Sequence, residues 1–225
     1  MPTWRFSIKG SKGSILYEKF HSDIFKFSEF FKFYNNLINN RRLLSIMKKY
    51  NYTGIFCLHP SFESQWIDFK QNEVFIVLEK CDYQKLLLKA SLLITDYSSI
   101  FFDFGYIKKP VIYTHFDYEE YRNTHYVEGY FDYNLDGFGP ICKDINCTIN
   151  EIIFQIKNNC ILRKKYLERI NDFFNFFDQN NSERVFTQII RNKRETTLKG
   201  NNYIYINFVV SICIIAYKFF KYLEK

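Results

Sequence analysis

A short apolar strand that ends at a cluster of polar side chains constrains the fold of this chain more than any other feature. Residues 92–94 (LLI) have the length and composition of a buried strand, and TDYSS follows directly at 95–99. Residues 100–107 suit a short, mostly buried helix, and residues 110–113 (PVIY) have the pattern of a second strand. If these strands pair in parallel, the polar turn lies at the carboxyl edge of a sheet, where ligands bind in α/β folds.

The polar turn fits two interpretations. Ser98 and Ser99 are favourable N-cap residues, and the free backbone N–H groups at a helix start suit a phosphate or pyrophosphate. The same residues would equally cap a helix that binds no ligand. The turn by itself does not distinguish a phosphate site from a simple capped helix.

Strand and helix patterns alternate through the first half of the chain. Residues 54–58 and 73–78 have strand patterns, residues 83–91 a short amphipathic helix, and residues 28–50 a helical pattern that breaks near Asn39. Helical patterns return later, over residues 149–161, 163–177 and 182–192. We therefore predict an α/β fold with an open, mostly parallel sheet, in which the first residues open an edge strand.

The composition argues against a disordered chain and against a disulfide-rich one. A chain of 225 residues with 20% aromatic side chains can bury a sizeable core, as one domain with an extension. The six cysteines include no CxxC pair and no leader sequence is recognised, so we expect reduced thiols in a cytosolic protein. The formal net charge of +7 favours anionic partners, and no nucleic-acid-binding motif is present.

Two segments have patterns that fit more than one structure. Residues 115–122 (HFDYEEYR) are aromatic and acidic without a clean period, so we interpret them as an ordered loop of the type that closes over a ligand. Residues 203–217 are uncharged and lie between Lys199 and Lys218, but this stretch is short for a membrane-spanning helix. It fits an interfacial or weakly spanning anchor, a partner-docking helix, or an artefact of the reading frame.

Several candidate site residues lie at or just beyond strand ends. His59 comes directly after a strand and precedes Pro60, so it either lines an edge site or is structural. Asp103 lies one helical turn beyond Ser99 and either binds ligand hydroxyls or stabilises the helix start. Asp96 suits hydrogen bonding to backbone N–H groups of the turn. Since no acidic cluster and no His/Cys set calls for a metal, we predict neither a metal nor a cofactor.

Four motifs occur in an order that resembles one protein family. They are PTWR at 2–5, HP at 59–60, TDYSS at 95–99 with FD at 102–103 and KPV at 109–111, and DQNNSERV at 178–185. In these motifs the chain resembles the CDP-glycerol glycerophosphotransferases, the family of teichoic acid primases and polymerases. The resemblance implies the carboxyl-terminal half of a GT-B type transferase. Residues 1–195 would form a Rossmann-like CDP-alditol-binding domain. Residues 196–225, beyond the resemblance, would form a linker and a hydrophobic tail suited to membrane association.

The chain departs from the family pattern at two places. Family members carry an amino-terminal domain with its own essential His, which has no counterpart in this sequence. In the loop after Asp117 the family usually has an Arg-Gly pair and a Pro-Gly-Pro turn, where this chain has VEG at 127–129 and FGP at 138–140. The resemblance therefore predicts half of an active site.

The reaction implied by the resemblance is attack of a terminal polyol hydroxyl on the β-phosphorus of CDP-glycerol or a related CDP-alditol, releasing CMP. The product would be a teichoic-acid-like or capsular polymer, built on a polyol-phosphate, polyanionic or lipid-linked glycan acceptor. Such an enzyme would lie in the cytoplasm, peripheral on the inner face of the membrane, with an amino-terminal partner chain and without nucleic acid. Two alternatives stay open: an inactive or split-enzyme donor-binding subunit, and a GT-B nucleotide-sugar glycosyltransferase.

The resemblance also assigns roles to individual residues. His59 would be the catalytic group, stabilising or protonating the leaving phosphate. Arg5 would offer a fixed positive fork to the donor. The full set of expected substrate contacts is Thr3, Arg5, Leu58, Thr95, Asp96, Ser98, Ser99 and Asp103.

Overall fold

The structure is a computed structural model that describes residues 1–5, 8, 25–59, 65–124 and 129–197, and the side chains up to residue 192. It divides the chain into two compact units, Met1–Phe174 and Asn175–Lys225. All the strands of the described residues belong to the first unit, so the fold of interest is contained there.

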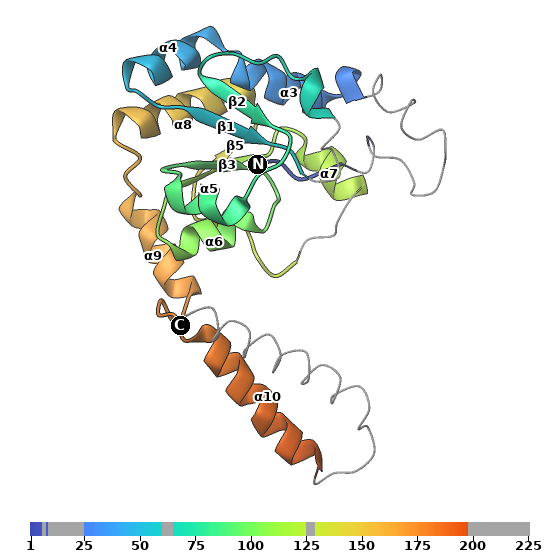
Figure 1. The fold of residues 1–225 in the computed structure, drawn as a ribbon, viewed down its shortest axis with the longest axis vertical. Helices are drawn as coiled ribbons and strands as arrows, with labels where there is room; N and C mark the ends of the chain where they lie inside the picture. The colour runs from blue at the N-terminus through green and yellow to red at the C-terminus, as the bar shows by residue number, and fades with distance from the viewer. Residues whose placement is uncertain (6–7, 9–24, 60–64, 125–128, 198–225) are drawn as a thin grey trace. The chain divides into compact units, whose positions relative to one another are not determined.

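All described strands of the first unit run parallel, in two groups (Figure 1). The first group pairs β1 (Gly54–Cys57) with β2 (Phe75–Leu78). The second has the order β3-β4-β5, with β3 at Leu93–Thr95, β4 at Val111–Thr114 and β5 at Ile141–Cys142. The predicted parallel pairing of the strands on either side of the polar turn is confirmed, since Leu93 lies opposite Val111.

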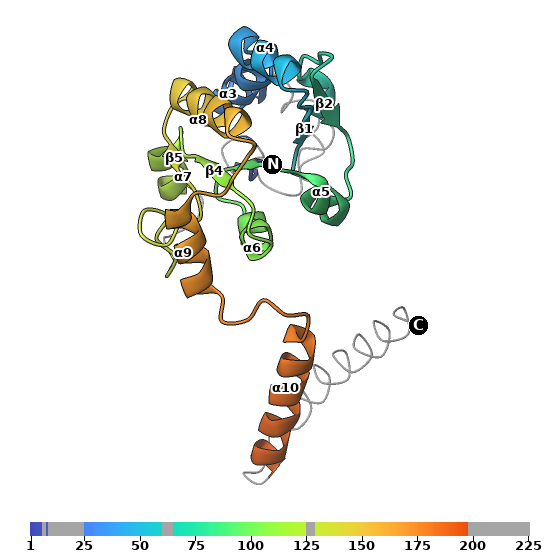
Figure 2. The same ribbon diagram turned by 90° about the vertical axis from the view of Figure 1, so that its left-hand side faces the viewer.

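Helices cover both faces of the strands (Figure 2). One face carries α3 (Glu29–Ile38), α4 (Arg41–Lys49) and α8 (Ile145–Lys157). The other carries α5 (Tyr83–Lys89), α6 (Ile100–Tyr106) and α9 (Lys164–Phe173). The predicted break near Asn39 is confirmed, because the Asn40 side chain caps α4 by accepting a hydrogen bond from the Leu43 N–H.

Two apolar clusters fix these layers. The first joins α3, α4 and α8 to β1 and β2, with Phe30 and Ile152 among its buried residues. The second packs α6 and α9 under β3 and β4, around Phe104 and Phe138. The segment before β5 passes so close to β4 that a Cβ on Gly139 would lie 1.9 Å from the Val111 carbonyl oxygen, so only glycine fits there. This close approach brings the loop before β5 onto the amino-terminal end of β4.

Two expectations from the sequence are corrected. The first residues are not assigned to a strand; the Met1 amino group donates to the Ile94 carbonyl oxygen of β3, and Met1 lines a cavity together with Ile55 of β1. The segment expected to be a loop contains a helix, α7 (Tyr118–Thr124), whose residue Tyr121 is buried. Packing of that aromatic side chain explains how a helix forms where the sequence has no clean period.

The second unit contains α10 (Asn181–Thr197), which begins near the predicted helix start at Ser182. Residues 203–217, the uncharged stretch, lie outside the described residues. Within the described part of the chain, no helix combines the length and hydropathy that crossing a bilayer requires.

Candidate functional site

Three of the sequence motifs meet at the carboxyl edge of β1 and β3. The Thr3 N–H donates to both carboxylate oxygens of Asp96, at 2.8 and 3.0 Å. The same carboxylate accepts from the Tyr97 N–H at 2.7 Å. The rings of Trp4 and His59 lie 6.5 Å apart. The first five residues therefore bridge the TDYSS turn and the His59 position, which sequence alone could not establish.

A buried cation organises this edge. Arg5 is 3% exposed, and its guanidinium lies 2.9 Å from the Asp96 carboxylate and 2.6 Å from the Asp117 carboxylate. The Nη1 atom of the same guanidinium donates to the Thr3 carbonyl oxygen at 2.8 Å. Burial opposes the charge of Arg5, but the two carboxylates outweigh it and raise its pKa. With these hydrogen-bond donors engaged inside the protein, Arg5 holds the turn and the start of α7 in place.

Aromatic rings stack beside the ion pairs. The Tyr97 ring lies between Tyr121, at 3.7 Å, and His115, at 4.4 Å between ring centroids. Burial lowers the pKa of His115 to about 4, so its imidazole is neutral at pH 7. Its Nε2 atom is buried and has no hydrogen-bond partner among the described residues. The stack fixes the side of the TDYSS turn that faces α7.

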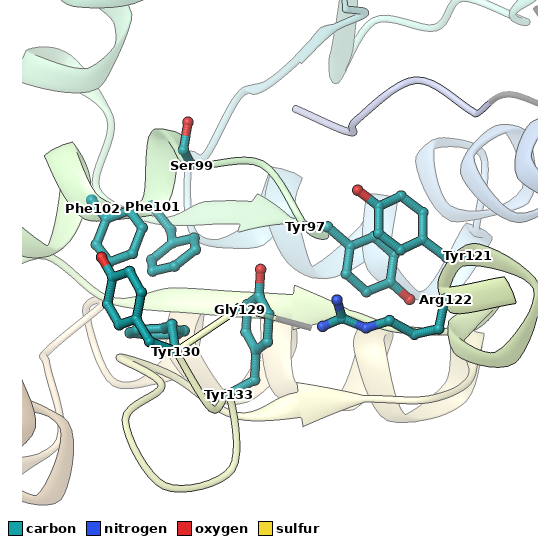
Figure 3. A pocket seen from close by; sticks show the side chains of 10 residues that line it. Tyr97, Ser99, Phe101, Phe102, Tyr121, Arg122, Gly129, Tyr130 and Tyr133 are labelled. Atoms are coloured by element: carbon teal, nitrogen blue, oxygen red, sulfur yellow. The ribbon is translucent and has the colours of Figure 1, made fainter. Parts of the chain in front are cut away.

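A cavity of about 230 Å³ opens beside this stack (Figure 3). Tyr97 and Tyr121 close one end and Tyr130 lies near the other, while Arg122 extends from α7 beneath the Tyr97 ring, 5.9 Å from its centroid. The remaining lining residues are Ser99, Phe101, Phe102, Gly129, Phe131 and Tyr133. Among the described residues that line the cavity none is acidic, so its one charged group is a cation suited to an anion.

A second cavity, of about 390 Å³, shares Gly129, Phe131 and Tyr133 with the first. His115, Lys143 and the acidic Asp132 also line it. Together the two cavities offer aromatic faces, two cationic side chains and one carboxylate. Such a lining suits a ligand that combines a planar ring with anionic groups.

The predicted site residues fall into separate environments. Thr95 and Asp96 are fully buried, and the Thr95 hydroxyl donates to the Met1 carbonyl oxygen at 2.7 Å. Leu58 is also buried, with its carbonyl oxygen accepting from Tyr83 at 3.2 Å. These residues shape the edge and do not line the first cavity.

The other predicted residues lie nearer the surface. Ser99 is exposed and lines the first cavity, and it precedes α6 without a side-chain capping bond. Ser98 is half-buried next to it, and Asp103 is exposed on α6. In Figure 3 the Ser99 hydroxyl points away from the tyrosine rings. Ser99 is thus the predicted contact that the structure brings to a cavity.

Sequence analysis missed the basic and aromatic residues that give the cavities their character. His115 and Arg122 lie in the segment that we interpreted as a loop of the type that closes over a ligand, but neither was assigned to the site, and Tyr133 was given no role. The sequence feature that could have indicated these residues is the high density of aromatic side chains after β4, in a segment that shows neither a helical nor a strand periodicity. Assigning them to a site required knowing that α7 folds back over the TDYSS turn.

Comparisons with known proteins identify the family. The family of CDP-Glycerol:Poly(glycerophosphate) glycerophosphotransferases matches over residues 1–191. The minor teichoic acid biosynthesis protein GgaB of Bacillus subtilis (strain 168) is 37% identical over 191 residues, which is 84% of this chain and 21% of GgaB. A teichoic acid poly(glycerol phosphate) polymerase of the same strain is 34% identical over 116 residues, 51% of this chain and 14% of the polymerase.

The solved structures agree on the fold. The wall teichoic acid polymerase TagF superimposes with a TM-score of 0.55 at 22% identity, over 88% of this chain and 43% of TagF. This likeness confirms the predicted α/β fold with open parallel sheets. The chain spans less than half of TagF and about a fifth of GgaB. By the match over residues 1–191, the chain belongs to the CDP-glycerol:poly(glycerophosphate) glycerophosphotransferase family.

Proposed function

We propose that this chain is the donor-binding half of a CDP-alditol phosphotransferase that makes teichoic-acid-like or capsular polymers. The observation that carries the proposal is the cavity of about 230 Å³ at the TDYSS turn, lined by aromatic rings, Ser99 and Arg122. A nucleotide-alditol needs a flat apolar surface for its base and positive or hydroxyl groups for its pyrophosphate. The cavity supplies both at the carboxyl edge of a parallel sheet, inside the matched region.

In the proposed reaction a terminal hydroxyl of the acceptor attacks the β-phosphorus of CDP-glycerol or a related CDP-alditol. A new phosphodiester bond forms, the pyrophosphate bond breaks, and CMP leaves. Arg122 and Ser99 hold the pyrophosphate oxygens and offset the charge that develops as CMP departs. His59 stabilises or protonates the leaving phosphate from the neighbouring strand end.

Arg5 has a positioning role in this proposal. Its ion pairs with Asp96 and Asp117 join the polar turn to the residues just before α7. Because α7 carries Arg122, the buried network sets the distance between that guanidinium and Ser99. Preorganised charges of this kind need no rearrangement when charge develops on the phosphate.

A second, related proposal concerns the acceptor side. The chain spans 43% of TagF, and we propose that turnover requires the part of the enzyme that this chain does not cover. In that arrangement the present residues supply the donor site. The formal net charge of +7 supports a peripheral position on the inner face of the membrane, where a polyanionic or lipid-linked acceptor grows.

Binding of CDP-glycerol to the double variant Ser98→Ala, Ser99→Ala tests the donor site. We expect calorimetry to show about tenfold weaker binding or more, because one or two charge-assisted hydrogen bonds to the pyrophosphate are lost. Ser45→Ala, on the exposed surface of α4, is the matched control and should bind normally. Equal affinity of the double variant and the control, with unchanged melting temperatures, would refute the proposed site. CDP-ribitol and a UDP-sugar in the same titration would distinguish donor classes.

A further inference from the structure

Two neighbouring helices open their outer sides onto one surface of the first unit. The helices α4 and α8 cover the same face of the strands and lie side by side in both views (Figures 1 and 2). Near their starts the Arg42 guanidinium donates to the Asn150 side chain at 2.8 Å. Just beyond their ends the Cys160 thiol donates to the Tyr52 hydroxyl at 3.7 Å. The two helices therefore run parallel, and the sides that face away from the core adjoin each other.

The outer side of α4 is basic. Leu43 and Met47 are buried against the core. The exposed positions on the other side recur with the helical period, and apart from Ser45 they are all cations: Arg41, Arg42, Lys48 and Lys49. Lys48 pairs with Glu73, and α4 itself contains no carboxylate. This side of the helix is therefore positively charged.

The outer side of α8 adds an aromatic ring and a further cation. Phe154 and Lys157 are both exposed, and Phe154 keeps 45% of its surface accessible although the Arg163 guanidinium lies 4.4 Å from its ring centroid. The one carboxylate of α8 belongs to Glu151 and is paired with Arg163. Ile161, just beyond the end of the helix, is 67% exposed. An exposed apolar ring thus lies on the same surface as the cations of α4.

We propose that this α4–α8 surface, formed by Arg41, Arg42, Lys48, Lys49, Phe154 and Lys157, docks on the anionic lipid surface of a membrane. The cations match negatively charged headgroups, and the ring matches the apolar region directly beneath them. A soluble polyanion would be bound by the cations and would leave Phe154 without a partner. The inference deepens the peripheral membrane position proposed above and rests on it.

Docking through the α4–α8 surface is compatible with binding of the donor. None of the described residues that line the cavity of Figure 3 belongs to α4 or α8. The cavity is built by the TDYSS turn, α6, α7 and the segment after α7, at the carboxyl edge of the strands. A lipid surface held by the outer sides of α4 and α8 therefore occupies different residues from the nucleotide.

Binding of the intact chain to vesicles tests the proposal. The probe is a phosphatidylcholine vesicle with about 30% phosphatidylglycerol, which supplies anionic headgroups, and co-sedimentation measures the bound fraction. We expect the triple variant Arg41→Gln, Lys49→Gln, Lys157→Gln to bind about a hundredfold more weakly than the native chain. Each of the three lost cations contributes about fivefold when it lies near an anionic surface.

Controls on the opposite face of the strands separate position from net charge. The triple variant Lys80→Gln, Lys85→Gln, Lys89→Gln removes the same charge from exposed positions on α5 and just before it, and should bind like the native chain. Phe154→Gln should weaken binding about fivefold, because the exposed part of the ring no longer enters the apolar region. Leu88→Gln, at an exposed apolar position of α5, should leave binding unchanged.

Three results would overturn the proposal. Equal binding by the two triple variants would place the membrane contact elsewhere in the chain. Undiminished binding by Phe154→Gln would indicate a surface for soluble polyanions, since only charge would then matter. Failure of the native chain to sediment with the anionic vesicles would refute the peripheral position itself, so that failure of the proposed location is distinguished from failure of the α4–α8 surface.

Discussion

Arg5 illustrates how a residue of a sequence motif can be bonded entirely inside the protein. Its guanidinium is 3% exposed and bonded to two carboxylates and a carbonyl oxygen. A phosphate would have to displace Asp96 or Asp117 to reach it. The Asp117 carboxyl depends on the same pairing, because burial raises its pKa and the hydrogen bond from Arg5 opposes that rise.

Replacing Arg5 by methionine should therefore destabilise the fold strongly. The variant leaves Asp96 and Asp117 buried without their cation, a loss of about 3–5 kcal/mol in the free energy of unfolding. Lys32→Met is the control, because the Lys32–Glu29 pair is exposed and should contribute less than about 1 kcal/mol. Urea denaturation measures both. An Arg5→Met protein as stable as the control that has lost CDP-glycerol binding would show direct contact with the donor instead.

His115 gives the fold a pH dependence of known sign. Burial lowers its pKa to about 4 in the folded chain, against about 6.5 when unfolded. Between these values the unfolded chain binds a proton that the folded chain does not, so stability falls as pH falls through this window. We expect the free energy of unfolding to decrease between pH 7 and pH 5 by about 2 kcal/mol more in the native chain than in His115→Gln. Equal decreases in urea titrations would contradict a buried neutral imidazole.

At the scale of elements, the sequence correctly predicted the helix and strand boundaries that depend on nearby residues. The break between α3 and α4 follows from Asn40, whose side chain caps the second helix. The strand, helix and strand around TDYSS follow from short apolar runs with turn residues between them. These features depend on residues only a few positions apart, so the sequence pattern was sufficient to predict them.

Elements that depend on distant partners were predicted less well. The helix α7 forms where Tyr121 stacks on Tyr97 and where Asp117 pairs with Arg5, contacts that join residues far apart in sequence. Pattern reasoning predicted a loop there and consequently missed Arg122 as a cavity residue. For Ser99 the sequence left a helix cap and a ligand contact open; the residue makes no side-chain capping bond, and it lines the cavity.

At the scale of the whole molecule, the proposed donor cavity belongs to a chain that spans less than half of TagF. Phosphoryl transfer needs the acceptor hydroxyl in line with the phosphorus and the leaving group of the donor. When the donor binds at the edge of a sheet, a second domain facing that edge can hold the acceptor in this position. The described residues that line the proposed donor cavity all come from this chain. The chain cannot by itself close the acceptor side in the arrangement we propose.

Complementation tests this view of the whole molecule. We expect the chain alone to bind CDP-glycerol but to release no CMP above the background rate with a glycerol-phosphate oligomer as acceptor. Addition of the amino-terminal half of a teichoic acid polymerase, in trans or as a fusion ahead of Met1, should restore CMP release because it supplies the acceptor side. The double variant Ser98→Ala, Ser99→Ala should lower the restored rate, which ties it to the donor cavity. CMP release by the chain alone, at the rate of the complemented pair, would show that this half is a complete enzyme.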